Sequence, residues 1–202
     1  MEYTPTQLKD EALYKLQGNW GQLALATFVF AIITGVAGII PFGGLLIGGP
    51  LTYGLNILYL KFTRTGSTEM NSMFDGFKDF GNALGAYFLM ALIILFFTIL
   101  LIVPGIIAAL ALSQTYRLMK DNPGMDCVAA MRKSRDIMRG HKADYFILNL
   151  SFIGWAILCV FTLMIGFFFL APYVYTTNTL FYNKLIGEGY DELEGFAEGV
   201  IQ

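Results

Sequence analysis

The sequence predicts an all-α polytopic membrane protein with six membrane helices, arranged as three hairpins that are each preceded by an amphipathic interfacial helix. Three observations predict this fold class: an apolar composition, a set of paired apolar runs, and an uneven distribution of basic residues. Because the same unit recurs with a period of about 60 residues, the sequence also predicts a threefold internal repeat.

The composition is far more apolar than that of a soluble domain. Of the 202 residues, 56% are hydrophobic and 14% are charged, whereas soluble domains carry about 25% charged residues. The mean hydropathy is +0.60. A net charge of −2 provides no basic excess for a nucleic-acid partner, so that class is excluded. A membrane is the expected environment.

Long and short apolar runs alternate along the chain. The long runs are Trp20–Ile40, Ala83–Val103 and Tyr145–Leu170, and about 20 helical residues cover the ~30 Å hydrocarbon core. Shorter, more polar runs follow at Gly44–Leu60, Gly105–Met119 and Ala171–Ile186, and the sequence leaves open whether these fully span. We expect turns near Pro41–Gly49, Val103–Gly105 and Gly166–Pro172. Pro50, Pro104, Gly105 and Pro172 are the expected turn or kink residues.

Basic residues give the expected orientation. All 13 lysines and arginines lie before, between or after the three hairpins or, as for Arg117 and Lys184, in the last residues of a short run, and the proline-containing turns carry none. The positive-inside rule therefore predicts that both termini are cytoplasmic. We expect a single membrane domain over residues 1–186, with repeat units at about 4–66, 67–120 and 121–186, followed by an acidic cytoplasmic tail over 187–202.

Three polar segments are expected to form interfacial helices that lie flat on the membrane. The alternative is that they pack on the bundle as ordinary connectors. The first begins with a capping box formed by Thr4 and Gln7 around Pro5. The third is expected to open at Asn122-Pro123. The second carries an apolar stripe with helical spacing, made of Met70, Met73, Phe74 and Phe77.

The third interfacial segment carries the first candidate site, a contact for anionic lipid. Four bases recur along it at spacings of 3, 4 and 3: Arg132, Arg135, Arg139 and Lys142. A base near an anionic leaflet contributes about 1 kcal/mol. The alternative is that these bases only fix the topology.

The short runs carry the second candidate site, an intramembrane polar cluster of Asn56, Gln114 and Asn178. An amide that faces lipid leaves its donors and acceptors unpaired, so these side chains are expected to face inward. They would act as a structural lock or as a polar site for a substrate. Four aromatic residues at the basic ends of the runs, Trp20, Tyr59, Tyr116 and Tyr182, are expected to form an interfacial belt.

Catalytic motifs are missing from the sequence. His141 is the only histidine, and no zinc-protease, CxxC, GxSxG or Walker pattern occurs. No catalytic residue, metal ligand or cofactor is predicted, and the chain is expected not to be an enzyme. Cys127 and Cys159 are expected to be free thiols because they lie in environments of different depth.

The stretch from Pro104 to Trp155 carries a distinctive set of strings. They are PGII from Pro104, DNP from Asp121, AMRKS from Ala130, MRGHK from Met138 and LSFIGW from Leu150. With them, almost the whole chain resembles the bacterial integral-membrane family called domain of unknown function 975. The resemblance implies a bacterial cytoplasmic membrane and no established biochemistry. More distantly, the stretch is similar to membrane domains attached to some bacterial glycerophosphodiester phosphodiesterases, whose catalytic domain has no counterpart in this sequence.

Two functions remain as hypotheses. The first is a non-enzymatic membrane module that organises lipids or partner proteins, indicated by the basic segment and the missing catalytic set. The second is a small transporter or lipid translocator, indicated by polar residues in the proline-interrupted short runs. The expected partners are lipids of an anionic leaflet, together with a protein partner or a second copy of the chain, and no nucleic acid.

Overall fold

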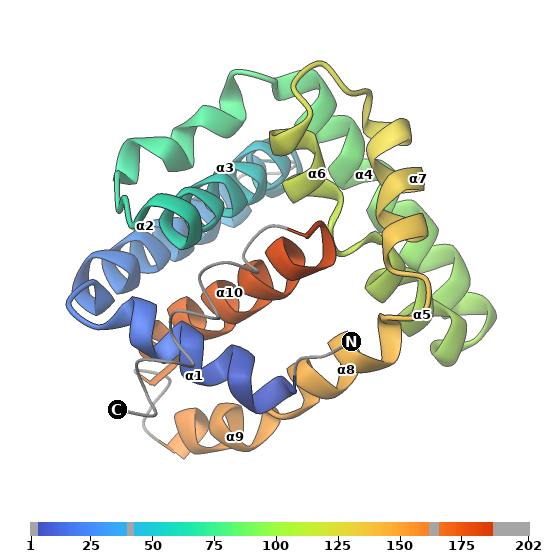
Figure 1. The fold of residues 1–202 in the computed structure, drawn as a ribbon. Coiled ribbons are helices and arrows are strands. Elements are labelled where there is room, and N and C mark those ends of the chain that lie inside the picture. The colour runs from blue at the N-terminus through green and yellow to red at the C-terminus, as the bar shows by residue number, and fades with distance from the viewer. Residues whose placement is uncertain (1–3, 40–42, 162–165, 188–202) are drawn as a thin grey trace.

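The computed structural model describes residues 4–39, 43–161 and 166–187, and within these ranges every regular element is a helix (Figure 1). The predicted acidic tail beyond Gly187 lies outside the described residues. In chain order the elements are α1 (Pro5–Leu16), α2 (Trp20–Ile39), α3 (Gly43–Thr65), the 3-10 helix η1 (Met70–Phe77), α4 (Phe80–Leu100), α5 (Ile102–Leu112), α6 (Thr115–Asp121), α7 (Cys127–Ile137), α8 (Lys142–Leu150), α9 (Ile153–Phe161) and α10 (Gly166–Leu185).

Four helical stretches are long and apolar enough to cross a membrane. They are Trp20–Ile39, Phe80–Leu100, Ile102–Asp121, which joins α5 and α6, and Lys142–Phe161, which joins α8 and α9. The protein is therefore an all-helical membrane protein. The helices α3 and α10 are 23 and 20 residues long, but their polar residues keep them outside this group.

The two more polar helices form the centre of the fold. Every residue of α3 from Gly48 to Leu60 except Thr52 is buried, as is every residue of α10 from Thr176 to Lys184. Figure 1 shows α10 in the middle of the helices, where it packs against α1, α2, α3 and α9. Protein, rather than lipid, surrounds these helices, and this explains why they tolerate amides and hydroxyls.

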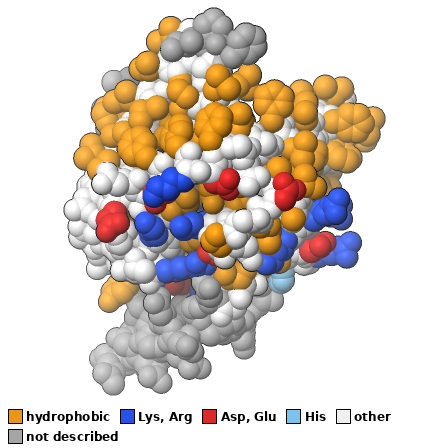
Figure 2. Space-filling model, turned by 90° about the horizontal axis from the view of Figure 1, so that it is seen from above, with side chains coloured by type: hydrophobic (Ala, Val, Ile, Leu, Met, Phe, Trp, Pro, Cys, Tyr) orange, Lys and Arg blue, Asp and Glu red, His pale blue; other side chains and the backbone are white. Residues whose placement is uncertain are grey.

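The more apolar helices lie at the periphery. Of the 21 residues of α4, only Ala83 and Ala86 are buried, and α9 buries only Cys159. Their large side chains face outward, and Phe161 is 81% exposed. Figure 2 shows hydrophobic side chains gathered over one part of the visible face, beside a belt of charged side chains. This division suits a hydrocarbon core next to a charged interface.

Several predicted boundaries are wrong. The second long run ends at Leu100 rather than Val103, because Leu101 is extended and α5 starts at Ile102. Val103–Gly105 is thus the first turn of α5, where Pro104 is tolerated because its missing N–H would have no helical partner. The third run is not one span over Tyr145–Leu170. The helix is interrupted between the end of α8 at Leu150 and the start of α9 at Ile153. The last part of the run, Gly166–Leu170, belongs to α10.

The expected turn and kink residues are placed differently in the structure. Pro50 and Pro172 lie inside α3 and α10 rather than at helix starts. Gly105 permits a close approach of α5 to α4, because a Cβ there would lie 2.1 Å from the Thr98 hydroxyl oxygen. The helix α3 begins at Gly43 and ends at Thr65, beyond both ends of the predicted run Gly44–Leu60. The helix α10 begins at Gly166, earlier than the predicted run Ala171–Ile186, and ends at Leu185.

The second interfacial segment is a 3-10 helix rather than an amphipathic α-helix. With about 3.0 residues per turn, its expected stripe splits: Met73 is fully buried, whereas Phe74 and Phe77 are 47% and 36% exposed. Its backbone presses directly on α3. A Cβ on Gly54 would lie 1.6 Å from the Met73 carbonyl oxygen, and one on Gly76 would lie 2.1 Å from the Pro50 carbonyl oxygen. This contact favours packing on the bundle for this segment.

The other two segments are α-helical. The capping box at Thr4 and Gln7 is present, with Pro5 as the first residue of α1. The helix α7 starts at Cys127 rather than at Asn122-Pro123, because the Asp126 carboxylate accepts from the Val128 N–H and caps it. One face of α1 is buried, and Glu11 on that face forms a 2.8 Å ion pair with Lys184 of α10.

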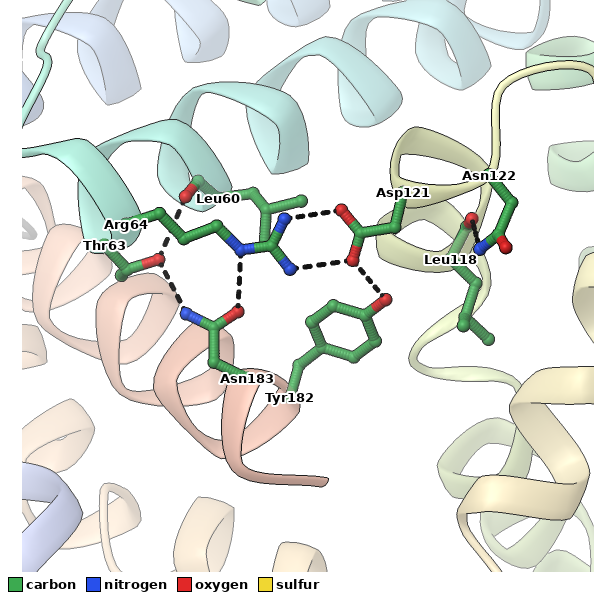
Figure 3. A network of polar contacts seen from close by, with 8 residues as sticks. All are labelled: Leu60, Thr63, Arg64, Leu118, Asp121, Asn122, Tyr182 and Asn183. Atoms are coloured by element: carbon green, nitrogen blue, oxygen red, sulfur yellow. Dashed lines mark hydrogen bonds and ion pairs between the residues drawn. The ribbon is translucent and has the colours of Figure 1, made fainter. Parts of the chain in front are cut away.

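A polar network joins the C-terminal ends of α3, α6 and α10 (Figure 3). The Arg64 guanidinium contacts both carboxylate oxygens of Asp121 at 2.6 and 2.8 Å. The Tyr182 hydroxyl donates to the same carboxylate at 2.6 Å. Asn183 accepts from Arg64 Nε at 3.3 Å and donates to the Thr63 hydroxyl at 3.2 Å. The network fixes the relative positions of these three helix ends.

Candidate functional site

A cavity of about 590 Å³ lies between the second helices of the three predicted hairpins, with α4 and α8 completing its wall. Its polar side comes from α3, α6 and α10 and includes Asn56, Tyr116, Arg117 and Asn178. Met90, Ala91 and Ile94 of α4 and Ala109 of α5 form an apolar side. The cavity therefore has the two-sided lining that is typical of a site for a small organic molecule.

Arg117 is the one charged residue in the described lining of this cavity. It is 4% exposed. Its Nη1 donates to the Gln114 side-chain oxygen at 2.8 Å, and no ion pair with a carboxylate is found for it among residues 4–39, 43–161 and 166–187. Removing a guanidinium from water without a counter-charge is costly. The lining thus carries an uncompensated positive charge.

Three lining residues have a buried polar atom without a hydrogen-bond partner in the described structure. These atoms are Arg117 Nε, the Tyr116 hydroxyl and Asn178 Oδ1. The orientation of Asn178 is fixed, because its Nδ2 donates to Asn149 Oδ1 at 3.1 Å and Asn149 donates to the Tyr145 carbonyl oxygen at 2.8 Å. Buried polar groups nearly always have a hydrogen-bond partner, so these three atoms indicate a binding site for a polar ligand.

The three amides of the predicted polar cluster are buried but do not form one cluster. Asn56 and Asn178 line the cavity, and Asn56 donates to the Thr52 carbonyl oxygen of its own helix at 2.9 Å. Gln114 instead lies at the break between α5 and α6, where it holds Arg117. No hydrogen bond joins one of these amides to another in the described part of the chain.

Ser134 attaches α7 to the break between α5 and α6. Its hydroxyl donates to the Ala111 carbonyl oxygen at 2.8 Å and accepts from the Gln114 N–H at 3.2 Å. Ser134 is fully buried beside Ala130 and Met131, so this side of α7 faces the bundle. The arrangement holds α7 across the end of α5.

Basic residues of α7 and α8 lie beside a second cavity, a groove of about 530 Å³ along α4 and α5. Its walls are apolar and include Leu89, Ile93 and Phe97 of α4 and Ile107 of α5. Arg132, Arg135 and Lys142 also line it. Arg139, the fourth predicted lipid contact, is exposed and outside this lining.

Metal-binding geometry does not arise in the described ranges, where no group of three or more His, Cys, Asp and Glu side chains could hold an ion. His141 Nδ1 lies 3.6 Å from an Asp144 oxygen. No disulfide joins Cys127 and Cys159. Burial raises the pKa of the Cys127 thiol, and the neighbouring Asp126 carboxylate raises it further.

Sequence reasoning missed Arg117, Tyr145 and Tyr175 as residues of the cavity. The sequence places Arg117 among the 13 bases that indicate the orientation, although its position three residues after Gln114 puts both on the same face of a helix. Tyr145 and Tyr175 had no sequence signal, because their convergence depends on how α8 and α10 pack.

No curated protein and no solved structure matches the chain. A family model does match residues 96–188, and its description is protein of unknown function (DUF975). The matched region runs from the end of α4 to the end of α10 and includes Arg117, Asn178 and the basic residues of α7. Over these residues the chain matches the DUF975 family.

Proposed function

We propose that the protein is a non-enzymatic module of the bacterial cytoplasmic membrane that holds an anionic lipid in the groove along α4 and α5. One observation carries the proposal: an apolar groove of about 530 Å³ shares its lining with Arg132, Arg135 and Lys142. Acyl chains suit the apolar walls, and a phosphate suits the bases.

The charge balance supports a lipid anion as the occupant. None of the three bases forms an ion pair with a carboxylate in the described ranges. Ser134 keeps the inner face of α7 against α5, so Arg132 and Arg135 stay beside the groove. A headgroup phosphate would supply the missing negative charge.

The proposal includes a topology. We infer six crossings in three hairpins, with α3 and α10 crossing inside a shell of more apolar helices, and a threefold repeat of the unit formed by a short helix, an apolar helix and a second helix. Both termini are then cytoplasmic. The order of elements from α1 to α10 supports this repeat, and burial of α3 and α10 accounts for their lower hydropathy.

Lipid binding to the purified full chain tests the proposal. Native mass spectrometry in an uncharged detergent would compare dioleoyl phosphatidylglycerol with dioleoyl phosphatidylcholine. In the variant with Arg132→Gln, Arg135→Gln and Lys142→Gln, the preference for phosphatidylglycerol should fall by about 3 kcal/mol, on the order of a hundredfold. The matched control carries Lys133→Gln and Arg139→Gln, which lie outside the groove lining. An equal loss in both variants would contradict a groove site and leave only the topological role.

A small transporter or lipid translocator is the second candidate function. The cavity between α3, α5, α6 and α10 supports it, because polar linings inside membrane proteins mark substrate paths. Proteoliposome flux of fluorescent lipids and of small ions would test it. Flux no faster than in protein-free vesicles for every solute would count against it.

A further inference from the structure

We propose that the central cavity is a binding site for a small oxyanion that carries a hydroxyl donor, the chemistry of a hydroxy acid or of a phosphate flanked by hydroxyls. The inference is independent of the lipid groove. It rests on the juxtaposition of Arg117, Tyr116 and Asn178 in one lining, with one unpaired buried polar atom on each residue.

The charge of the ligand follows from Arg117. This residue is 4% exposed, and no carboxylate neutralises it in the described ranges. Gln114 occupies only Nη1, so Nε–H remains to donate. The Tyr116 hydroxyl is a second unpaired donor. A carboxylate or phosphate oxygen satisfies both donors and compensates the buried charge.

The hydroxyl of the ligand follows from Asn178. Its amide nitrogen donates to Asn149, which leaves Oδ1 as a buried acceptor. A second oxyanion oxygen cannot satisfy this atom, whereas a hydroxyl can. The carbon body of the ligand then faces the apolar wall formed by Met90, Ala91 and Ile94.

Equilibrium dialysis with radiolabelled lactate tests the site on the delipidated full chain in an uncharged detergent. Lactate should bind saturably at one molecule per chain, and propionate, which lacks only the hydroxyl, should compete about tenfold less well. Inorganic phosphate and short-chain phosphatidylglycerol are the other competitors. Competition by phosphatidylglycerol but not by free phosphate identifies a lipid headgroup as the source. The reverse result identifies a free solute.

Two variants and a control locate the binding. Arg117→Gln removes the charge and should weaken lactate binding about tenfold or more. Asn178→Asp keeps the size of the side chain but adds a negative charge beside the anion, and it should weaken binding by a similar factor. Arg132→Gln, in the separate groove, should leave lactate binding unchanged. Size-exclusion elution of each variant checks its folding.

The proposal is overturned if neither lactate, phosphate nor phosphatidylglycerol binds to the wild-type chain. It is also overturned if folded Arg117→Gln and Asn178→Asp variants bind as tightly as the wild type. Equal competition by lactate and propionate would refute the hydroxyl part of the assignment. Loss of binding in Arg132→Gln, with Arg117→Gln unaffected, would move the anion to the groove and refute the cavity site.

Discussion

Arg64 and Asp121 are 57 residues apart in the sequence, and they form a two-point ion pair with N–O distances of 2.6 and 2.8 Å (Figure 3). The pair joins the end of α3 to the end of α6, and Tyr182 and Asn183 attach the end of α10 to it. The network thereby joins the ends of three helices that are far apart in the sequence.

Asp121→Asn should destabilise the protein. The change removes the Asp121 charge that pairs with Arg64 and one of the two equivalent oxygens available to the Tyr182 hydroxyl, so we expect the free energy of unfolding to fall by about 1–3 kcal/mol. The unfolding temperature in detergent is the measurement. Asp136→Asn is the control, because Asp136 is an exposed residue on α7. If both variants melt like the wild type, the network has no structural role.

Gly54→Ala should be among the most damaging single changes, because the new methyl group would enter the backbone of η1 at Met73. Overpacking of this kind costs about 1–3 kcal/mol or more. Gly81→Ala is the matched control, since a Cβ at Gly81 meets nothing within 4 Å. In a helix this control should be neutral or stabilising by up to about 1 kcal/mol. Thermal unfolding of the two variants should therefore shift in opposite directions or by clearly different amounts.

Substitutions of the three predicted amides, Asn56, Gln114 and Asn178, should lower the stability of the protein by different amounts. Gln114→Leu removes the acceptor of Arg117 Nη1 and should cost about 1–3 kcal/mol in a thermal or denaturant melt. Asn56→Leu breaks only a bond within α3 and should cost less. Equal destabilisation by Asn56→Leu, Gln114→Leu and Asn178→Leu would instead favour a single structural lock.

Cys127 should react slowly with alkylating reagents. Burial raises the pKa of its thiol, and the thiolate is the reactive form. At any pH below that raised pKa, a smaller fraction is therefore ionised than in a free cysteine, whose pKa is about 8.5. In a Cys159→Ala background, the rate of iodoacetamide alkylation should rise at a higher pH than for free cysteine. A rate profile that matches free cysteine would contradict this environment.

The proposed orientation can be tested with single cysteines in a Cys127→Ala, Cys159→Ala background. A cysteine at Leu101, in the exposed bend between α4 and α5, should label with an impermeant maleimide on intact cells. A cysteine at Lys133, on the exposed face of α7, should label only after permeabilisation. The opposite pattern would invert the topology.

The patterns along the chain were enough to predict an all-helical membrane protein. Long apolar runs predict apolar helices whatever their neighbours, because about 20 such residues match the bilayer core. The starts of α1 and α2 were also predictable, since the Thr4 capping box and the residues around Gly18 act locally.

Tertiary structure decided what the polar and aromatic residues do. Tyr59, Tyr116 and Tyr182 were expected to form an interfacial belt, yet all three are buried. Tyr59 stacks on Tyr175 at 5.0 Å between ring centroids, and Tyr182 binds Asp121. A residue at the end of an apolar run has the same local sequence whether lipid headgroups or another helix lie beside it.

The difference between local sequence and tertiary packing also explains why the basic groove could be anticipated from the sequence and the central cavity could not. The spacing of Arg132, Arg135 and Lys142 is a property of one segment, so the sequence itself indicated a basic surface. The cavity depends on residues from six helices that meet only when α3 and α10 occupy the centre. Hydropathy marked those helices as weaker spans because it assumes that a membrane helix faces lipid. In the structure the neighbours of α3 and α10 are other helices of the protein. Because of this packing, Arg117 is a buried charge and not a base at the membrane surface.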